Sequence, residues 1–366
     1  MDSSDASSVV DSAQAIREGE TLDTAKLKTY LASVLTDGSG EISIAQFRKG
    51  HSNLTYLIDV GQRELVLRRP PFGAAIKSAH DMGREYSILS ALDELYDKAP
   101  KPIHYCEDAE VIGAPFYLME RVSGVILRGN RPPRGLEISA ETMRGIALAA
   151  VDNLATLHGL PARAGGLADL GRPKGYVERQ VHGWTKRYFD AKTDEVPQVE
   201  HAAAWLAENM PGDCATPALI HGDYKYDNLV LDADDLTRIV SVLDWEMATV
   251  GDPLMDLGTS LGYWLDPDDP PAHKLLPFGP TLLPGNPSRR EVIERYAEKS
   301  GCEVGDALFY YVYGLFKIIV IAQQIYKRFV LGHTKDPRFG AMIIGVKTIG
   351  DTAARALERD RIDGLG

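Results

Sequence analysis

The sequence predicts an α+β protein with two lobes, a small antiparallel β lobe followed by a larger, mainly helical lobe. Two observations predict this class. Short segments with β character, separated by the turns Lys49-Gly50 and Gly61-Gln62, crowd into residues 42–69. After about residue 124, apolar residues recur mostly at helical spacing. The length of 366 residues is sufficient for two such units with a ligand cleft between them.

The N-terminal lobe is expected over residues 21–122. Before it, residues 1–20 are acidic, rich in serine and poor in large apolar residues, which predicts a disordered leader. Tyr86, Leu89 and Leu92 recur at helical spacing and predict a helix between strand segments. The expected elements are a helix at 23–35, strands at 42–47, 54–60 and 64–69, a helix at 79–95, and strands at 103–106 and 115–119.

The helical lobe is expected over residues 123–366. Its first long helix ends at Gly159, a residue type that often closes helices. A short β-like insert interrupts the helices and carries the densest polar chemistry of the chain. The expected helices are 140–158, 175–190, 199–209, 289–300, 305–332 and 335–358, and the strands of the insert are 218–220, 228–231 and 238–243.

Composition excludes several classes of partner. The net charge of −12 disfavours nucleic acid and anionic membrane surfaces, because both would repel the average field of the chain. The most apolar stretch, 310–330, carries Lys317, Lys327 and Arg328, so we expect a buried helix rather than a membrane span. Three widely spaced cysteines form neither a zinc motif nor a disulfide framework. The N-terminal stretch does not look like a signal peptide, which predicts a cytoplasmic protein, and the oligomeric state stays open.

The densest polar cluster runs from His221 to Asn228, and a second cluster follows at Asp244. Both come directly after short apolar segments, so we expect their polar groups on rigid supports at one opening. Phosphoryl transfer requires a carboxylate near the attacking hydroxyl, oxygen ligands for Mg²⁺ and cations on the phosphates. Asp223 suits the first role, and Lys225 could neutralise transferred charge. Asn228 and Asp244 suit the second role, because Mg²⁺ prefers hard oxygen ligands.

The H-x-D-x-K-x-x-N pattern that begins at His221, with an Asp sixteen residues after Asn228, resembles the catalytic loop and metal-binding Asp of protein-kinase-like enzymes. Three segments are similar to motifs of the aminoglycoside phosphotransferase family: His-Gly-Asp-Tyr, Leu-Asp-Trp-Glu and Gly251-Asp-Pro-Leu-Met-Asp-Leu-Gly258. Within that family, the chain resembles the phosphotransferase-like domain associated with acyl-CoA dehydrogenases, over roughly residues 40–330. The resemblance implies a protein-kinase-like two-lobed fold and a transferase that uses ATP and Mg²⁺.

The resemblance also implies roles for the residues of the two motifs. Asp223 would be the catalytic base or the residue that orients the hydroxyl, His221 would brace the catalytic loop, and Lys225 lies on the same loop. Asn228 and Asp244 would hold Mg²⁺.

In the N-terminal lobe, the resemblance implies a set of ATP contacts. The turn that contains Ser52 and Asn53 would cover the phosphates, and the hinge segment with Glu120 and Val122 would recognise adenine. Arg68 stands where the family usually has the phosphate-binding lysine, and Glu85 would pair with it. Arg69 beside it makes this assignment ambiguous, and a guanidinium differs from an ammonium in reach and geometry. The phosphate turn also has a single glycine rather than several.

The acceptor hydroxyl is the least determined part of the site. Aromatic residues of the helical lobe are candidate lining residues. The acidic loop with Asp266, Asp268 and Asp269 would suit a polycationic aminoglycoside, whereas a basic patch would suit the phosphates of an acyl-CoA. The aromatic candidates are Tyr224, Trp245, Tyr263, Trp264, Tyr310, Tyr311, Tyr313 and Phe316, and the basic ones are Arg128, Arg131, Arg134, Lys174, Arg179, Lys186 and Arg187.

The leading hypothesis is an ATP-dependent kinase for a hydroxyl of a small metabolite, with a hydroxyacyl-CoA favoured by the family resemblance. One alternative is an aminoglycoside or amino-alcohol kinase on the same fold. Another is a nucleotide-binding pseudokinase that acts as a binding module. The segment from Gly258 to Gly262 matches the nucleophile elbow of α/β-hydrolases, but it is expected inside a helix, where small residues serve packing.

Overall fold

The N-terminal lobe is built on a five-stranded antiparallel sheet with the strand order β1-β2-β3-β5-β4. In this computed structural model the described residues are 9–36, 38, 40–48, 53–72, 81–162, 164, 166–334 and 336–366. The strands are β1 (Ile42–Phe47), β2 (Leu54–Val60), β3 (Arg63–Arg69), β4 (Pro102–Cys106) and β5 (Phe116–Glu120).

Helices cover both faces of this sheet, because its strands alternate apolar side chains between two cores. Leu65 and Leu67 of β3 face a core with α2 (Thr24–Val34) and the short α4 (Ala109–Ile112). Val66 between them joins the main core, which includes α3 (Met82–Leu92). Over the described residues, the predicted N-terminal elements are confirmed within a few residues, and α4 is the one helix there that was not expected.

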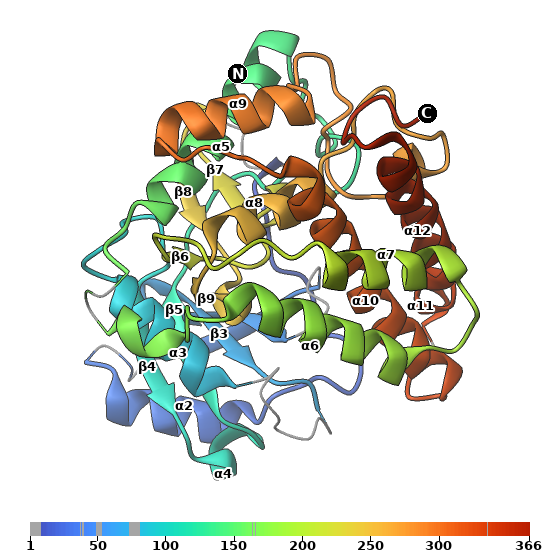
Figure 1. The fold of residues 1–366 in the computed structure, drawn as a ribbon. Coiled ribbons are helices and arrows are strands. Elements are labelled where there is room, and N and C mark those ends of the chain that lie inside the picture. Colours follow the sequence, from blue (N-terminus) through green and yellow to red (C-terminus); the bar gives the residue numbers. More distant parts are fainter. Residues whose placement is uncertain are drawn as a thin grey trace.

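The helical lobe surrounds α10 (Ala307–Val330), which packs against α6 (Tyr176–Ala191), α7 (Pro197–Glu208), α8 (Pro253–Gly262) and α12 (Met342–Arg359). Figure 1 shows α7, α10 and α12 together on the right and the sheet of the N-terminal lobe at the lower left. Helix α10 is long and apolar enough to cross a membrane by composition alone, but 72% of its most apolar window is buried inside the fold. The remaining helices of this lobe are α5 (Ala140–His158), α9 (Arg289–Ser300) and α11 (Pro337–Gly340).

Small residues let α8 and α10 approach closely. A Cβ atom added to Gly314 would lie 1.9 Å from the carbonyl oxygen of Gly258, and one added to Gly258 would lie 2.1 Å from that of Tyr310. No real side chain fits at such distances. The expectation that the small residues of this segment serve helix packing is confirmed.

Two short two-stranded antiparallel sheets form the insert that carries the polar motifs. Strand β6 (Ala218–Ile220) pairs with β9 (Thr249–Gly251), and β7 (Leu229–Leu231) pairs with β8 (Ile239–Val242). The sequence predicted β6, β7 and β8 but missed β9, a three-residue strand whose ends are set by its pairing with β6. The two sheets fix both ends of the segment from residue 221 to residue 228.

The structure corrects two sequence-based expectations. The described part of the expected disordered leader, residues 9–20, is packed on the protein: Val9 is buried, Gln14 pairs with Gln46 of β1, and the Asp11 amide donates to the Gly124 carbonyl. Backbone pairing therefore orders a segment whose composition alone is polar. The single helix expected over 335–358 is divided into α11 and α12, at the point where Gly340 packs against the ring of Phe329.

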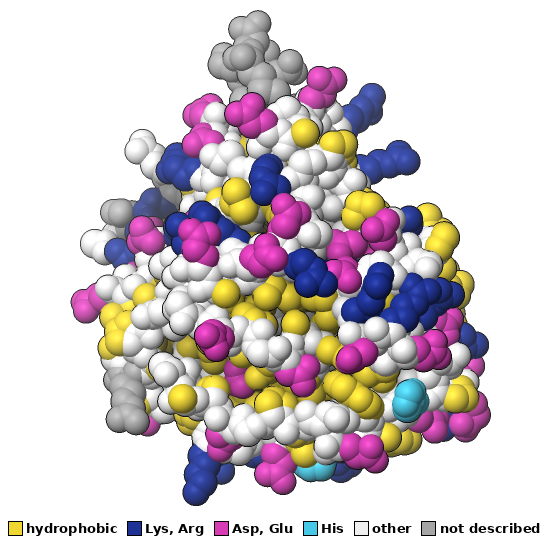
Figure 2. Space-filling model, turned by 45° about the horizontal axis from the view of Figure 1, so that its top comes forward, with side chains coloured by type: hydrophobic (Ala, Val, Ile, Leu, Met, Phe, Trp, Pro, Cys, Tyr) yellow, Lys and Arg dark blue, Asp and Glu magenta, His cyan; other side chains and the backbone are white. Residues whose placement is uncertain are grey.

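One face of the molecule is shown in Figure 2. Acidic and basic side chains are interspersed over most of it, and apolar side chains gather near its middle. Charges of both signs therefore alternate over this face rather than forming one continuous field.

Candidate active site

A cavity of about 870 Å³ lies where the two lobes meet. The sheet contributes Thr55, Val66, Arg68 and Met119, and the segment after β5 contributes Val122. The polar motifs of the insert contribute Asp223, Lys225, Asp227, Asn228, Asp244 and Glu246, and helices α6 and α10 form much of the remaining wall. The structure thus brings residues from positions 11 to 342 to one opening.

His221 braces the loop between β6 and β7. Its Nδ1 atom accepts a hydrogen bond from the Asp223 amide at 3.2 Å, so its Nε2 atom carries the proton and donates to the Leu243 carbonyl at 2.9 Å. Burial lowers the pKa of His221, which keeps the ring neutral and consistent with this tautomer. The ring therefore ties the Asp223 segment to the Asp244 segment, which fits the bracing role inferred from the resemblance.

Asp256, in the first turn of α8, binds the backbone of the same loop. Its two carboxylate oxygens accept the amides of His221 at 2.7 Å and Gly222 at 2.8 Å, and the Nε2 atom of His158 lies 3.2 Å away. Burial alone would raise the pKa of the Asp256 carboxyl, but its hydrogen bond and charge interaction with His158 hold it below the ordinary value. A buried carboxylate therefore fixes the backbone that precedes Asp223.

The Asp223 carboxylate is oriented by its loop neighbours. Its Oδ2 atom lies 2.9 Å from Lys225 Nζ and 3.2 Å from Asn228 Nδ2, which also donates to the Asp223 carbonyl at 2.8 Å. Burial alone would lower the pKa of Lys225, but the adjacent Asp223 carboxylate raises it, so the ammonium stays charged. Because Asn228 directs its nitrogen toward Asp223, its Oδ1 atom is the one that can bind a cation.

Asp244 follows β8 in a left-handed backbone conformation with φ of 70°, which is uncommon for a residue other than glycine. Its Oδ1 atom lies 2.9 Å from Arg68 Nη2, and Arg68 Nη1 lies 2.9 Å from Glu85 Oε1 in α3. Burial alone would raise the pKa of Asp244, but the Arg68 guanidinium holds it below its ordinary value. The carboxylate is therefore ionised and available as an oxygen ligand.

The structure assigns Arg68, not Arg69, to the cavity. Val66 and Arg68 of β3 both line the cavity, because alternate residues of a strand share a face. Arg69 lies on the opposite face, where it donates to the Ile112 carbonyl at 2.8 Å and stacks on Phe72 at 3.7 Å.

The remaining residues predicted to bind nucleotide lie mostly at the same opening. Asn53 donates to Glu246 Oε2 at 2.8 Å, which joins the end of the phosphate turn to the segment after Asp244. Glu120 and Val122 line the cavity, and the Val122 amide has no hydrogen-bond partner among the described residues. Ser52 lies outside the described residues.

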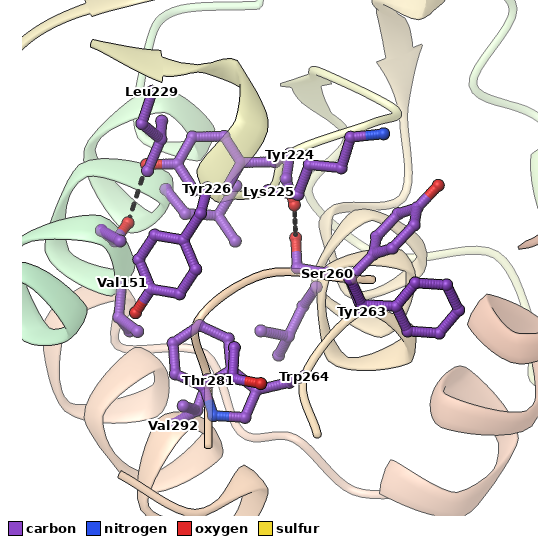
Figure 3. A pocket seen from close by; sticks show the side chains of 14 residues that line it. Val151, Tyr224, Lys225, Tyr226, Leu229, Ser260, Tyr263, Trp264, Thr281 and Val292 are labelled. Atoms are coloured by element: carbon purple, nitrogen blue, oxygen red, sulfur yellow. Dashed lines mark hydrogen bonds between the residues drawn. The ribbon is translucent and has the colours of Figure 1, made fainter. Parts of the chain in front are cut away.

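A smaller, apolar cavity of about 30 Å³ lies behind the catalytic loop. Figure 3 shows Tyr224 and Ser260 at its edge, with Ser260 Oγ donating to the Tyr224 carbonyl at 2.8 Å and the Tyr224 hydroxyl donating to the Ala150 carbonyl at 2.8 Å. Lys225 and Tyr263 line both cavities. Apolar packing and these two hydrogen bonds therefore support the loop.

Most of the aromatic residues predicted to line the acceptor site belong to the core instead. Tyr263 lines the large cavity, whereas Trp264 and Tyr224 line the small one. The others are absent from the large cavity and buried: Trp245, Tyr310, Tyr311, Tyr313 and Phe316. Their positions on α10 and in the insert were predicted, but helical spacing does not specify which face meets the core.

The acidic loop proposed for a polycation has a structural role. Asp266 and Asp269 are buried against Arg289, whose Nη2 atom lies 2.5 Å from Asp269 Oδ1. Burial raises the pKa of Asp266 to about 6, despite Arg289. These two carboxylates stabilise the loop before α9 and are absent from the cavity lining.

Three lining residues of the helical lobe were not predicted as a group. Lys317 of α10 donates to the Gly222 carbonyl, and Trp184 and Arg187 of α6 lie beside it in the cavity wall. Burial lowers the pKa of Lys317. Lys317, in the middle of the apolar run of α10, was the signal available in the sequence.

This arrangement of lobes, catalytic loop and cavity defines a protein-kinase-like phosphotransferase that acts on small molecules. The Phosphotransferase enzyme family profile matches residues 43–290, and the chain belongs to that family. Among solved structures, a candidate aminoglycoside phosphotransferase from Ralstonia eutropha is 28% identical, with a TM-score of 0.77 over 93% of this chain and 99% of that chain. A GDP complex of aminoglycoside 2'-phosphotransferase-IIIa, at 16% identity, shares the fold with a TM-score of 0.60 over 89% of this chain and 98% of that chain.

The chain is also similar to curated relatives whose names refer to acyl-CoA dehydrogenases. It is 35% identical to human acyl-CoA dehydrogenase family member 11 over 86% of its own length. It is 32% identical to a probable acyl-CoA dehydrogenase from Arabidopsis thaliana, IBR3, over 80% of its length. The chain spans about 40% of the length of the first of these relatives and 37% of the second. The predicted fold class and family are confirmed.

Proposed function

We propose that this protein transfers the γ-phosphoryl group of ATP, with Mg²⁺, to a hydroxyl of a small metabolite, with a hydroxyacyl-CoA as the acceptor. The observation that carries the proposal is the convergence of Asp223, Asn228, Asp244 and Arg68 on one cavity between the lobes. Phosphoryl transfer depends mainly on positioning and charge stabilisation, and this set supplies both.

The donor set fits a hard divalent cation. Asn228 Oδ1 and the ionised Asp244 carboxylate line the same cavity, and both are oxygen ligands of the type Mg²⁺ takes from proteins. Bound Mg²⁺ would neutralise charge on the phosphates. Arg68, held by Glu85, would contact the phosphates from the opposite lobe. The Val122 amide, which has no hydrogen-bond partner in the described part of the chain, would donate to adenine.

Asp223 would accept the proton of the acceptor hydroxyl. Lys225 and Asn228 both contact its Oδ2 atom, so Oδ1 is the atom that neither of them contacts. In the reaction, the acceptor oxygen forms a bond to the γ-phosphorus, the bond from that phosphorus to the bridging oxygen of ADP breaks, and the hydroxyl proton moves to Asp223. Lys225 would then offset charge on the transferred group.

The names of the curated relatives support an acceptor from acyl-CoA metabolism. The structural neighbours named for aminoglycosides support the alternative, an aminoglycoside or amino-alcohol kinase. The burial of Asp266 and Asp269 against Arg289 favours the first, because it removes the acidic loop from the site.

The test is ADP release from Mg-ATP in the presence of hydroxyacyl-CoAs, amino alcohols and aminoglycosides. Asp223→Asn should bind Mg-ATP almost normally and lose about 10²- to 10⁴-fold in turnover. Asp244→Ala should weaken Mg-ATP binding in calorimetry. Turnover by Asp223→Asn at the wild-type rate would contradict the mechanism. If the wild type bound Mg-ATP but turned over none of the acceptors, a pseudokinase would be favoured.

A further inference from the structure

Two cations flank one indole ring on the helical wall of the large cavity. Lys317 Nζ lies 5.7 Å from the centre of the Trp184 ring, and the Arg187 guanidinium lies 4.6 Å from a ring centre of the same residue. The ring is held in place by its Nε1 atom, which donates to Gln180 Oε1 at 3.1 Å. We call Lys317, Trp184 and Arg187 the cationic wall, and all three line the cavity.

The cationic wall differs from the catalytic centre in how its charges are compensated. At the catalytic centre the charges are paired, Asp223 with Lys225 and Asp244 with Arg68, both at 2.9 Å. Arg84, which also lines the cavity, donates both ends of its guanidinium to the backbone carbonyls of Glu246 and Ala248. Within the described part of the chain, neither Lys317 nor Arg187 has a carboxylate within 4 Å. Lys317 has one hydrogen bond, to the carbonyl of Gly222, although an ammonium has three donors.

Burying a charge without a counter-charge is costly, so buried charges in proteins are usually paired. Lys317 is only 5% exposed, and the two carboxylates whose charges act on it, Asp256 and Asp223, both have other partners. Asp256 accepts two backbone amides, and Asp223 binds Lys225. The unmet positive charge therefore points to a ligand that brings negative charge to this wall.

The wall beyond these cations is apolar. Ile321 and Ile325, one and two turns after Lys317 on α10, line the same cavity together with Met342 of α12. A ligand that fits both features has an anionic group and an adjoining apolar portion.

We propose that the cationic wall is the specificity element of the acceptor site and selects an acceptor with an anionic group and an apolar chain. The inference rests on the proposed function, because it assigns the ligand class of the same cavity. Lys317 also holds the carbonyl of Gly222, the residue before Asp223. Lys317 would thereby contact the anionic group of the acceptor close to Asp223, which receives the hydroxyl proton. A polycationic acceptor would meet repulsion at the same place.

The experiment compares acceptors that differ in charge and share one chain. The probes are hydroxydodecanoate, its neutral amide and its CoA thioester, with kanamycin as the polycation. The readouts are ADP release from Mg-ATP, resolved into kcat and KM, and the rise in Tm with each probe and Mg-ADP. Hydroxydodecanoate carries its negative charge on a carboxylate, whereas the thioester carries it on the phosphates of CoA. Comparing these two probes therefore shows which anion the cationic wall binds.

The wild type should prefer an anionic probe over the amide by at least about tenfold in kcat/KM, which corresponds to about 1.4 kcal/mol. Arg187→Gln and Lys317→Met should each reduce that preference, mainly through KM for the anionic probe. Arg187 is exposed, so its variant is expected to fold even if Lys317→Met does not. Lys186→Gln is the matched control, because Lys186 lies on the same helix, pairs with Asp190 at 2.6 Å and does not line the cavity.

Different failures have different meanings. If kanamycin or the amide is phosphorylated as well as the anionic probes, the phosphotransferase assignment stands and the specificity inference is overturned. The inference is also overturned if the anionic preference survives unchanged in Arg187→Gln. If no probe stimulates ADP release or raises Tm, both the proposed function with these acceptors and the inference fail.

Discussion

Arg68 and Asp244 connect the two lobes directly, with Nη2 of the guanidinium 2.9 Å from Oδ1 of the carboxylate. The same guanidinium reaches Glu85 with Nη1, so one side chain holds two carboxylates on different elements. A planar fork with several donors can do this, whereas a lysine ammonium is a single point charge. An arginine at position 68 can therefore bind Glu85 and Asp244 at the same time.

We predict that Arg68→Lys lowers kcat/KM for ATP about tenfold and that Arg68→Met lowers it about 100-fold. The reason is that one or both charge-assisted contacts are lost, each corresponding to about 1.5–3 kcal/mol. Steady-state kinetics at varied ATP concentration tests this. Arg69→Lys is the control, because Arg69 binds the Ile112 carbonyl on the far face of the sheet and should leave ATP kinetics unchanged. Wild-type kinetics for Arg68→Met would exclude Arg68 from the nucleotide site.

Asp256 offers a second test, which addresses the position of the catalytic loop. Asp256→Asn replaces one of two accepting oxygens with a donor, so it cannot accept both the His221 and the Gly222 amides. We expect kcat to fall about 10- to 100-fold with little change in the Kd for nucleotide, measured by turnover and calorimetry. Asp252→Asn on the same helix keeps its N-cap function and should retain kcat. An equal loss in both variants would indicate a general effect of α8 instead.

The sequence predicted the fold and the catalytic loop because both are encoded locally. Strand alternation, helical spacing and the closely spaced motif from His221 to Asn228 lie within short segments. Strand alternation also distinguishes Arg68 from Arg69. Arg69 shares one face of β3 with Leu65 and Leu67, and Arg68 shares the other face with Val66.

The acceptor side could not be predicted in the same way, because it depends on how distant helices pack. Tyr310 and Tyr313 were expected in the site, but they face the core through the close contact of α8 and α10. Lys317 on that same helix faces the cavity. Tyr310, Gly314 and Lys317 recur at helical spacing on one side of α10. The sequence therefore does not tell which part of that side packs on Gly258 of α8 and which part reaches the cavity.

His273 predicts a pH dependence of stability. It is 1% exposed, its Nδ1 atom lies 2.5 Å from Thr352 Oγ1 in α12, and burial lowers its pKa to about 4 from the ordinary 6.5. Between these values the unfolded chain binds more protons than the folded one, so the free energy of unfolding falls as the pH decreases.

This single group should reduce the free energy of unfolding by about 2 kcal/mol between pH 7 and pH 5. His273→Gln removes the titrating ring, so its loss of stability over the same interval should be smaller by about that amount. Urea denaturation at both pH values measures the difference. Equal pH dependence in the two proteins would show that His273 is not the group responsible.

The contact between α8 and α10 gives a prediction about the support of the site. Gly314→Ala would place a Cβ 1.9 Å from the Gly258 carbonyl oxygen, so the helices must separate. We expect the free energy of unfolding to fall by about 3 kcal/mol. We also expect kcat to fall, because α8 carries Asp256 beneath the catalytic loop.

The matched control for this change is Gly183→Ala within α6. A Cβ atom there would meet nothing within 4 Å, and alanine favours helix by up to about 1 kcal/mol relative to glycine. The same substitution should therefore stabilise the protein at one position and destabilise it at the other, as measured by urea denaturation. If Gly314→Ala were as stable as Gly183→Ala, the close approach of α8 and α10 would not be what holds the catalytic loop in place.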